Sequence, residues 1–194
     1  MNRTATVTRK TAETDITATV DLDGNGLAEI DTGVGMFDHL LAALAHHSMI
    51  DIAVRTVGDL HVDEHHTVED TALVLGSAID EALGDRSGIT RYANAAVPMD
   101  EAVARCVLDV GGRPYAVLDL EFQGERMGTL GVQMIPHALE SFARTSRSTF
   151  HLQASGRNDH HIAEAAFKAL AVALRAAVAI DPRRIGVPST KGTL

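Results

Sequence analysis

Residues 65–70 read HHTVED, and residues 160–164 read HHIAE. Each stretch holds two adjacent histidines and, after two intervening residues, a glutamate. A further histidine lies at a similar distance upstream of each stretch, His39 in GMFDHLL and His137 in MIPHALE. A pattern of metal-ligating residue types that recurs in the same context predicts an internal duplication, with two metal ions brought together.

The spacing within each stretch indicates how the side chains are shared. On a helix, residues i and i+4 lie on one face, so His65 and Glu69 can bind one ion, as can His160 and Glu164. The adjacent histidines point about 100° away around the helix axis. If two such helix starts face each other around a twofold axis, each adjacent histidine reaches the partner's ion. The two predicted sets are His65, Glu69, His137 and His161, and His160, Glu164, His39 and His66.

The ligand types point to a catalytic metal. Three imidazole nitrogens and one carboxylate oxygen, without thiolate, suit Mn, Fe, Co or Zn. Four protein ligands leave open positions on an ion that prefers six, which is typical of a catalytic site. Two adjacent histidines at a helix start could instead be an exposed polar end of the helix, and a single such motif would be weak evidence for a metal site. Its duplicate in matching context favours metal binding.

The remaining histidines have no counterpart in the repeat. We expect His46 and His61 to be surface or structural residues. His151 lies in the strand-like run STFHLQ, where a hydrogen-bonded core histidine is one reading. His47 lies two helical turns after His39, so a role beside the ligands or the substrate is open.

The alternation of polar and apolar residues predicts the same elements twice. In the first half, residues 5–33 read as strands with a hairpin turn at DGNG (23–26). A helix (36–48), a strand (49–59) and a helix (65–85) follow. In the second half, two strands (97–123), a helix (135–146), a strand (148–156) and a helix (158–180) follow, the last capped by Asn158 or Asp159.

We therefore expect an α+β fold of duplicated β-β-α-β-α half-domains, each a four-stranded sheet with two helices on one face. Residues 1–92 form the first half-repeat. Residues 93–194 form the second, with a C-terminal tail, and both belong to one compact domain. The tail (181–194) is irregular and basic, and its composition favours a frayed end. The alternative is a phosphate-binding arm that carries Ser189, Thr190 and Lys191.

Composition narrows the function classes. The 194 residues are 45% hydrophobic and 22% charged, which is ordinary for a soluble globular protein. A net charge of −9, no Trp and 4% aromatic residues argue against nucleic-acid binding. The only cysteine, Cys106, lies in an apolar run and is expected to be buried and inert. We expect a cytoplasmic protein, because no disulfide can form within the chain and the N-terminus lacks a signal-peptide core. We expect no membrane span, because Glu164, Lys168 and Arg175 interrupt the most apolar helical stretch.

Several longer motifs carry a family resemblance. They are TGVGMFDHLL, GDLHVDEHHTVEDTALVLG, PMDEA, GGRPY, NDHHIAEAAFKAL and GVPSTKG. In this order, from about Arg9 to Leu194, the chain resembles the imidazoleglycerol-phosphate dehydratase family. The resemblance implies a hydro-lyase of histidine biosynthesis that converts imidazole glycerol phosphate to imidazole acetol phosphate with two Mn²⁺ ions per active site. It also implies a fold of the ribosomal protein S5 domain 2-like class, and a 24-mer with active sites between subunits.

The resemblance also assigns roles to residues. It implies that the metal ligands are the eight residues of the two sets above, and that Glu13, His47, Glu69 and Glu164 take part in catalysis. Asp100 and Glu101 in PMDEA match a motif near the site, without a firm role. Ala43 stands where many relatives carry a glutamine that can contact substrate. The implied substrate- and phosphate-binding residues are Arg91, Arg113, Lys168, Ser189 and Lys191.

The expected chemistry is an elimination. A cation on the substrate's imidazole nitrogen favours the imidazolate, which can expel hydroxide from the adjacent carbon through a diazafulvene-like intermediate. Glu13 is a candidate general base or acid. One alternative is a di-metal phosphoester hydrolase. Such sites usually use carboxylates that bridge the two ions, and a set of six imidazoles and only two carboxylates is less suited to that. Another alternative is a metal-storage or structural assembly, in which the ions only join subunits. The open coordination positions on the ions argue against it.

Overall fold

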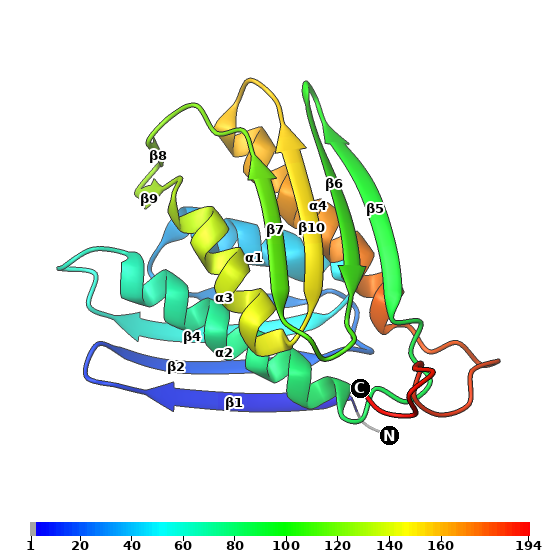
Figure 1. The fold of residues 1–194 in the computed structure, drawn as a ribbon. Coiled ribbons are helices and arrows are strands. Elements are labelled where there is room, and N and C mark those ends of the chain that lie inside the picture. The colour runs from blue at the N-terminus through cyan, green and yellow to red at the C-terminus, as the bar shows by residue number, and fades with distance from the viewer. Residues whose placement is uncertain (1–2) are drawn as a thin grey trace.

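Two four-stranded sheets enclose four helices in the computed structural model, which describes residues 3–194 (Figure 1). The first sheet has the strand order β1-β2-β4-β3, and the second has β5-β6-β10-β7. The first half of the chain forms β1 (Thr4–Lys10), β2 (Thr14–Asp21), β3 (Ala28–Asp31), α1 (Gly35–Ser48), β4 (Asp51–Gly58) and α2 (His65–Leu83). The second half forms β5 (Tyr92–Met99), β6 (Ala102–Asp109), β7 (Tyr115–Leu120), β8 (Arg126–Met127), β9 (Leu130–Gly131), α3 (Met134–Ser146), β10 (Thr149–Ser155) and α4 (Asp159–Val178).

The predicted α+β class, with two four-stranded sheets and four helices, is confirmed. The predicted order of elements is corrected, because three strands of the four-stranded sheet, and not two, precede the first helix of each half, and the second half adds the short pair β8 and β9. In the second half the missed strand is β5, whose inward face carries Ala93, Ala95 and Val97. These small residues give a weak alternation of hydrophobicity, but they let α4 pack closely on the strand.

The predicted hairpin turn at residues 23–26 is wrong. Strands β2 and β3 are not neighbours, because β4 lies between them, antiparallel to β2 and parallel to β3. The connection is instead held by Asp51, whose Oδ1 accepts hydrogen bonds from the backbone N–H groups of Asn25 and Leu27 at 2.7 and 2.8 Å. A Cβ at Gly24 would lie 2.4 Å from Cγ of Asp51, so this close approach requires glycine.

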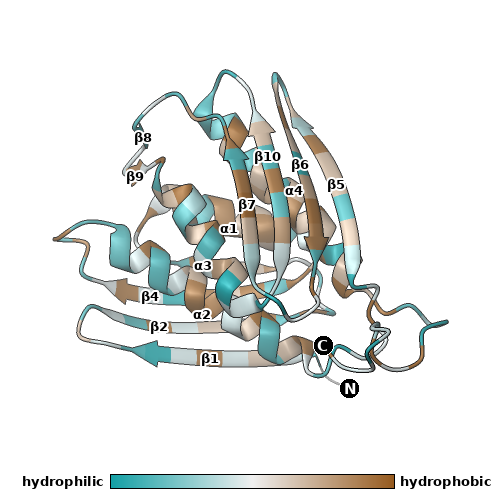
Figure 2. Cartoon of the chain, in the orientation of Figure 1, coloured by the Kyte–Doolittle hydropathy of each residue, from teal (hydrophilic) through white to brown (hydrophobic). Residues whose placement is uncertain are grey.

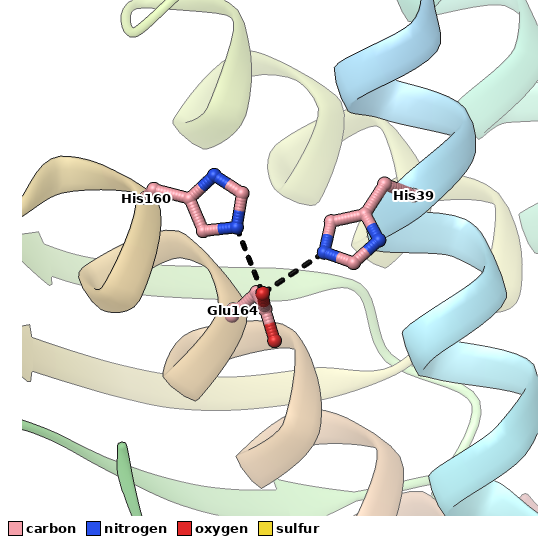
Figure 3. Close-up of side chains that lie close together, drawn as sticks. All are labelled: His39, His160 and Glu164. Atoms are coloured by element: carbon pink, nitrogen blue, oxygen red, sulfur yellow. Dashed lines mark hydrogen bonds and ion pairs between the residues drawn. The ribbon is translucent and has the colours of Figure 1, made fainter. Parts of the chain in front are cut away.

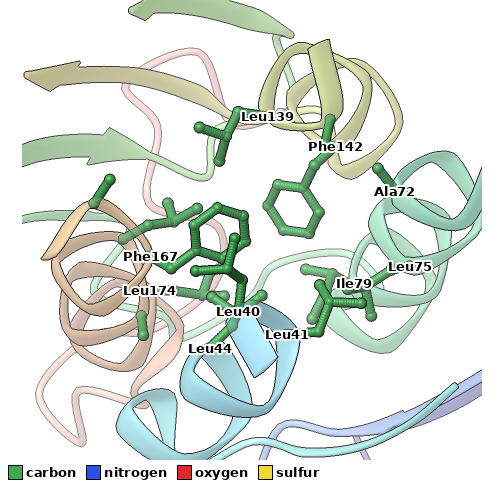
Figure 4. Close-up of a cluster of buried hydrophobic side chains, with 14 of the residues drawn as sticks. Leu40, Leu41, Leu44, Ala72, Leu75, Ile79, Leu139, Phe142, Phe167 and Leu174 are labelled. Carbon is green, nitrogen blue, oxygen red and sulfur yellow. The ribbon is translucent and has the colours of Figure 1, made fainter. Parts of the chain in front are cut away.

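The core lies between the sheets, where α1 packs on α4 and α2 packs on α3. Figure 4 shows side chains from all four helices meeting there, including Leu41, Leu75, Phe142 and Phe167. Each sheet turns one face inward, and along β2 buried and exposed residues alternate, as the bands of hydropathy in Figure 2 illustrate. Cys106 of β6 is fully buried in this core, as predicted. The helices thus share one core, which fixes their N-terminal ends relative to one another.

The C-terminal tail is tied to the segment between α2 and β5. Gly88 donates a backbone hydrogen bond to Gly186 and accepts one from Asp181, each at 2.9 Å. Nη1 of Arg91 donates to the carbonyl of Pro188 at 2.7 Å. The prediction of a frayed tail, which composition favoured, is therefore wrong as far as Pro188. These contacts hold the tail against the segment between α2 and β5. Across residues 3–194, no helix has the length and apolar character needed to cross a membrane.

Candidate metal centre and substrate site

Three residues from two helices converge in the first cluster, which we call trio A: His39, His160 and Glu164 (Figure 3). Nε2 of His39 and Nε2 of His160 lie 2.9 and 2.8 Å from the same oxygen, Oε1 of Glu164. The ring centroids of the two histidines are 5.4 Å apart. Two nitrogens and one oxygen that face a common point match the donors of a transition-metal site.

The second cluster, trio B, has the same form and consists of His65, Glu69 and His137. Nε2 of His65 and Nε2 of His137 lie 3.5 and 3.2 Å from one oxygen, Oε2 of Glu69. Nε2 of His137 is buried and makes no well-formed hydrogen bond within residues 3–194. A buried nitrogen that has no hydrogen-bond partner and faces a carboxylate fits a bound cation between them.

The local folds explain why the sets meet. Each trio has two members, four residues apart, at the start of one helix, α4 or α2. The third comes from the helix packed against it, His39 from α1 or His137 from α3. Asn158 caps α4 as expected, because its side chain accepts a hydrogen bond from the backbone N–H of His160 at 3.0 Å.

The two histidine side chains of trio A are exposed, whereas its glutamate is buried and charged. It lines a pocket of about 650 Å³ together with the β8–β9 turn and the start of α4. Burial of Glu164 favours its neutral form, but hydrogen bonds from Lys168, His39 and His160 outweigh burial and lower the pKa of Glu164 to about 2. Glu164 is therefore an anion over the physiological pH range and is suited to binding a cation.

His66 and His161 belong to neither trio. Nδ1 of His66 lies 3.0 Å from Oδ2 of Asp59, and Nδ1 of His161 lies 2.8 Å from Oε2 of Glu101. The hydrogen bond with His161 lowers the pKa of Glu101 to about 2. The structure thus brings together three members of each predicted set of four and leaves the fourth pointing elsewhere.

The two further residues with implied catalytic roles lie outside both trios. Glu13 occupies the exposed turn between β1 and β2, and its Oε1 lies 3.8 Å from Nε2 of His66. His47 is half-buried on α1, and burial lowers its pKa, with smaller contributions from His46 and Lys168. His47 is therefore a neutral imidazole at physiological pH, able to donate or accept a hydrogen bond.

The predicted phosphate-binding residues divide into two groups. Arg91, Arg113, Ser189 and Lys191 line one pocket of about 720 Å³ between the start of β5 and the tail. Arg91 is buried and pairs with Asp109, whose hydrogen bond raises the pKa of the guanidinium. Lys168 lies apart from this pocket, with its ammonium 2.5 Å from Oε2 of Glu164 beside trio A.

The three remaining histidines, and two carboxylates beside the site, complete the comparison with the sequence-based predictions. His151 is exposed on the outer face of the second sheet, so its reading as a core histidine is wrong. His46 and His61 are exposed, as expected. The contacts that Asp59 and Glu101 make with histidines were not predicted. The PMDEA motif placed Glu101 near the site, but its partner His161 is 60 residues away in the chain and meets it only in the fold.

The sequence and the fold match one known family along the chain. A sequence model described as imidazoleglycerol-phosphate dehydratase matches residues 32–174. An imidazoleglycerol-phosphate dehydratase of Methanoculleus marisnigri is 56% identical over 192 residues, 99% of this chain and 100% of that protein. One of Rhodopseudomonas palustris is 54% identical over 194 residues, 99% of this chain and 98% of that protein.

A solved structure shows the same fold. The crystal structure of the Pyrococcus furiosus enzyme in complex with (S)-C348 superposes with a TM-score of 0.83 at 35% identity, and the match covers 97% of this chain and 100% of that one. The two relatives are more than half identical to this chain over 99% of its length, and the solved structure matches its fold over 97%. The chain therefore belongs to the imidazoleglycerol-phosphate dehydratase family.

Proposed function

We propose that trios A and B bind the two divalent metal ions, Mn²⁺ in the cell, with which this enzyme dehydrates imidazole glycerol phosphate. The chain is a hydro-lyase of histidine biosynthesis, and the product is imidazole acetol phosphate. The observation that carries the proposal is the convergence of two Nε2 atoms on one glutamate oxygen in each trio. Nothing in the relatives supports a phosphoester hydrolase.

The fourth ligand of each ion comes, we propose, from a second copy of the chain. His66 and His161 lie at the starts of α2 and α4, the helices that also carry members of the trios. Their Nδ1 atoms contact carboxylates, and their Nε2 atoms lie outside both trios. A twofold contact would bring His161 of one copy to trio B of another, and His66 to trio A. Each active site would then lie between two subunits, in keeping with a closed symmetric assembly, which we propose is a 24-mer.

The reaction removes a proton from one substrate carbon and hydroxide from its neighbour, and the resulting enol rearranges to the ketone. Bound divalent ions supply the charge that makes loss of the imidazole proton easier. Glu13 is exposed and adjacent to His66, so it is placed to accept the carbon-bound proton or to protonate the departing hydroxide. His47, a neutral imidazole near Lys168, is suited to hydrogen-bond the substrate.

The substrate phosphate requires cations away from the metal ions. The pocket lined by Arg91, Arg113, Ser189 and Lys191 supplies two guanidinium groups, a hydroxyl and an ammonium. Lys168, beside Glu164, would face the substrate from trio A. A cytoplasmic location stays part of the proposal, supported by the single buried cysteine, which suits a reducing compartment.

Metal content tests the proposal directly. Wild-type protein dialysed against Mn²⁺ should retain about two ions per chain, one for each trio. His65→Asn and His160→Asn should each lose one ion and all detectable formation of the ketone product. His46→Asn is the matched control, because His46 is exposed on α1 and belongs to neither trio. Full metal content in both trio variants would refute the assignment.

A further inference from the structure

Two carboxylates hold the second histidine of each HHxxE motif, and they do so in the same way. His66 and His161 each use Nδ1, not Nε2, to contact a carboxylate, Asp59 at 3.0 Å and Glu101 at 2.8 Å. The two contacts occupy matching places, since each histidine follows the first histidine of its HHxxE motif. Because both contacts involve the same ring nitrogen, we infer that Asp59 and Glu101 have the same role.

The geometry at Glu101 fixes which atom carries the ring proton. Oε1 of Glu101 accepts hydrogen bonds from the backbone N–H groups of Arg157 and Asn158, at 3.2 and 3.0 Å. These two donors hold Oε1 in the loop before α4 and leave Oε2 to face His161. A carboxylate only accepts hydrogen bonds, so Nδ1 of His161 must donate. A neutral ring with its proton on Nδ1 has a free lone pair on Nε2, which is the form that binds a metal ion.

We propose that Glu101 is a positioning residue that holds His161 in the Nδ1-protonated tautomer, with Nε2 presented to the metal ion of another subunit. Asp59 does the same for His66. The inference rests on the proposed metal site and adds to it the residues that prepare its fourth ligands. The neighbouring Asp100 is exposed at the turn between β5 and β6, so of the two acidic residues in PMDEA it is Glu101 that contacts the ligand.

The substitution Glu101→Gln separates a positioning role at His161 from simple support of the loop before α4. In Glu101→Gln, the amide oxygen keeps the place of Oε1, because the two backbone N–H groups require an acceptor there. The amide NH₂ then faces Nδ1 of His161, which must accept, and the ring proton moves to Nε2. The variant keeps the loop contact but reverses the tautomer. Glu101→Ala loses the loop contact and leaves the ring free to adopt either tautomer.

Metal affinity is the readout, measured by competition with a chelator at fixed pH. For Glu101→Gln we expect one of the two ions to bind about 10- to 100-fold more weakly, with the other unchanged. Glu101→Ala should weaken the same ion less. The value of kcat for the glutamine variant should recover as Mn²⁺ is raised, because the ligand is disfavoured and not removed. Glu121→Gln is the matched control, because Glu121 is an exposed carboxylate directly after β7, and this variant should bind both ions normally.

Two results would contradict the positioning role of Glu101. Wild-type affinity in Glu101→Gln, or a larger loss in Glu101→Ala than in Glu101→Gln, would show that Glu101 only supports the loop and would overturn the inference. His161→Asn distinguishes this from failure of the metal site itself. If His161→Asn loses an ion while Glu101→Gln keeps it, only the positioning role fails. If His161→Asn keeps both ions, His161 is not a ligand and the proposed shared site fails.

Discussion

Nη1 of Arg91 donates a hydrogen bond to the backbone carbonyl of Pro188 at 2.7 Å, although 97 residues separate the two in the chain. The same guanidinium pairs with both oxygens of Asp109, with Nε to Oδ1 at 2.8 Å and Nη2 to Oδ2 at 3.1 Å. Arg91 thereby joins the end of β6 to the tail that carries Ser189 and Lys191. A buried cation therefore holds the tail in place.

Replacing Arg91 tests this connection. Arg91→Lys keeps the charge but cannot make the two-point pair with Asp109, so the free energy of unfolding should fall by about 2 kcal/mol. The tail should be cut faster by trypsin, and KM should rise. Arg113→Lys is the control, because Arg113 is exposed and its Nη2 lies 4.0 Å from Asp109. It should raise KM without loss of stability, and equal stability losses in both variants would contradict the difference in roles.

Glu13 should affect turnover and not folding. Because it lies on an exposed turn, Glu13→Gln should leave the thermal midpoint unchanged. Loss of a general acid–base group should lower kcat by about 100-fold or more. Steady-state kinetics at saturating Mn²⁺ measure this, and Glu29→Gln on exposed β3 is the control. A normal kcat with normal substrate binding would remove Glu13 from the proton-transfer step.

Asp51 should contribute stability that depends on pH. Hydrogen bonds from the backbone N–H groups of Leu27 and Asn25 lower its pKa below the ordinary value of 3.8. Since the folded-state pKa is depressed, the contribution is present above about pH 4 and disappears as pH falls through the folded-state pKa. Asp51→Asn should therefore be less stable by about 1 kcal/mol near neutral pH and indistinguishable from wild type in acid. Urea unfolding across this range measures the difference, and a deficit that persisted in acid would contradict it.

Cys106 should be unreactive in the folded protein. Burial raises the pKa of its thiol to about 12, and the side chain is fully enclosed by the second sheet and α4. Iodoacetamide at about pH 8 should leave the native protein unlabelled and modify it fully in concentrated guanidinium chloride. Mass spectrometry counts the label. Rapid labelling of the native protein would mean that the core between α4 and the second sheet opens readily.

The sequence predicted the parts of the site that depend on local geometry. The i, i+4 spacing places His65 with Glu69 and His160 with Glu164, because a helix brings these positions onto one face. The four helices followed from strong 3.6-residue periodicity. Their long apolar stripes carry more signal than the short strands at the sheet edges do.

The rest depends on contacts between distant segments. The insertion of β4 between β2 and β3 is decided by packing under α1 and α2, so a glycine-rich link looked like a hairpin turn. The contact of Glu101 with His161 forms only after β6 and α4 meet. In the same way, Arg91 fixes the tail through a backbone carbonyl, a partner that no side-chain motif reveals.

Sharing of each active site between subunits is tested most directly by mixing two inactive variants. His65→Asn destroys trio B and His160→Asn destroys trio A, so neither should be active alone. If one site combines trio B of one chain with trio A of another, random co-assembly leaves about one quarter of sites with both trios intact. The two chains would be co-expressed with different tags, purified through both tags and assayed for the ketone product. We predict recovery to about one quarter of wild-type activity. A mixed assembly with no activity would contradict shared sites, because every site confined to one chain would then lack a ligand.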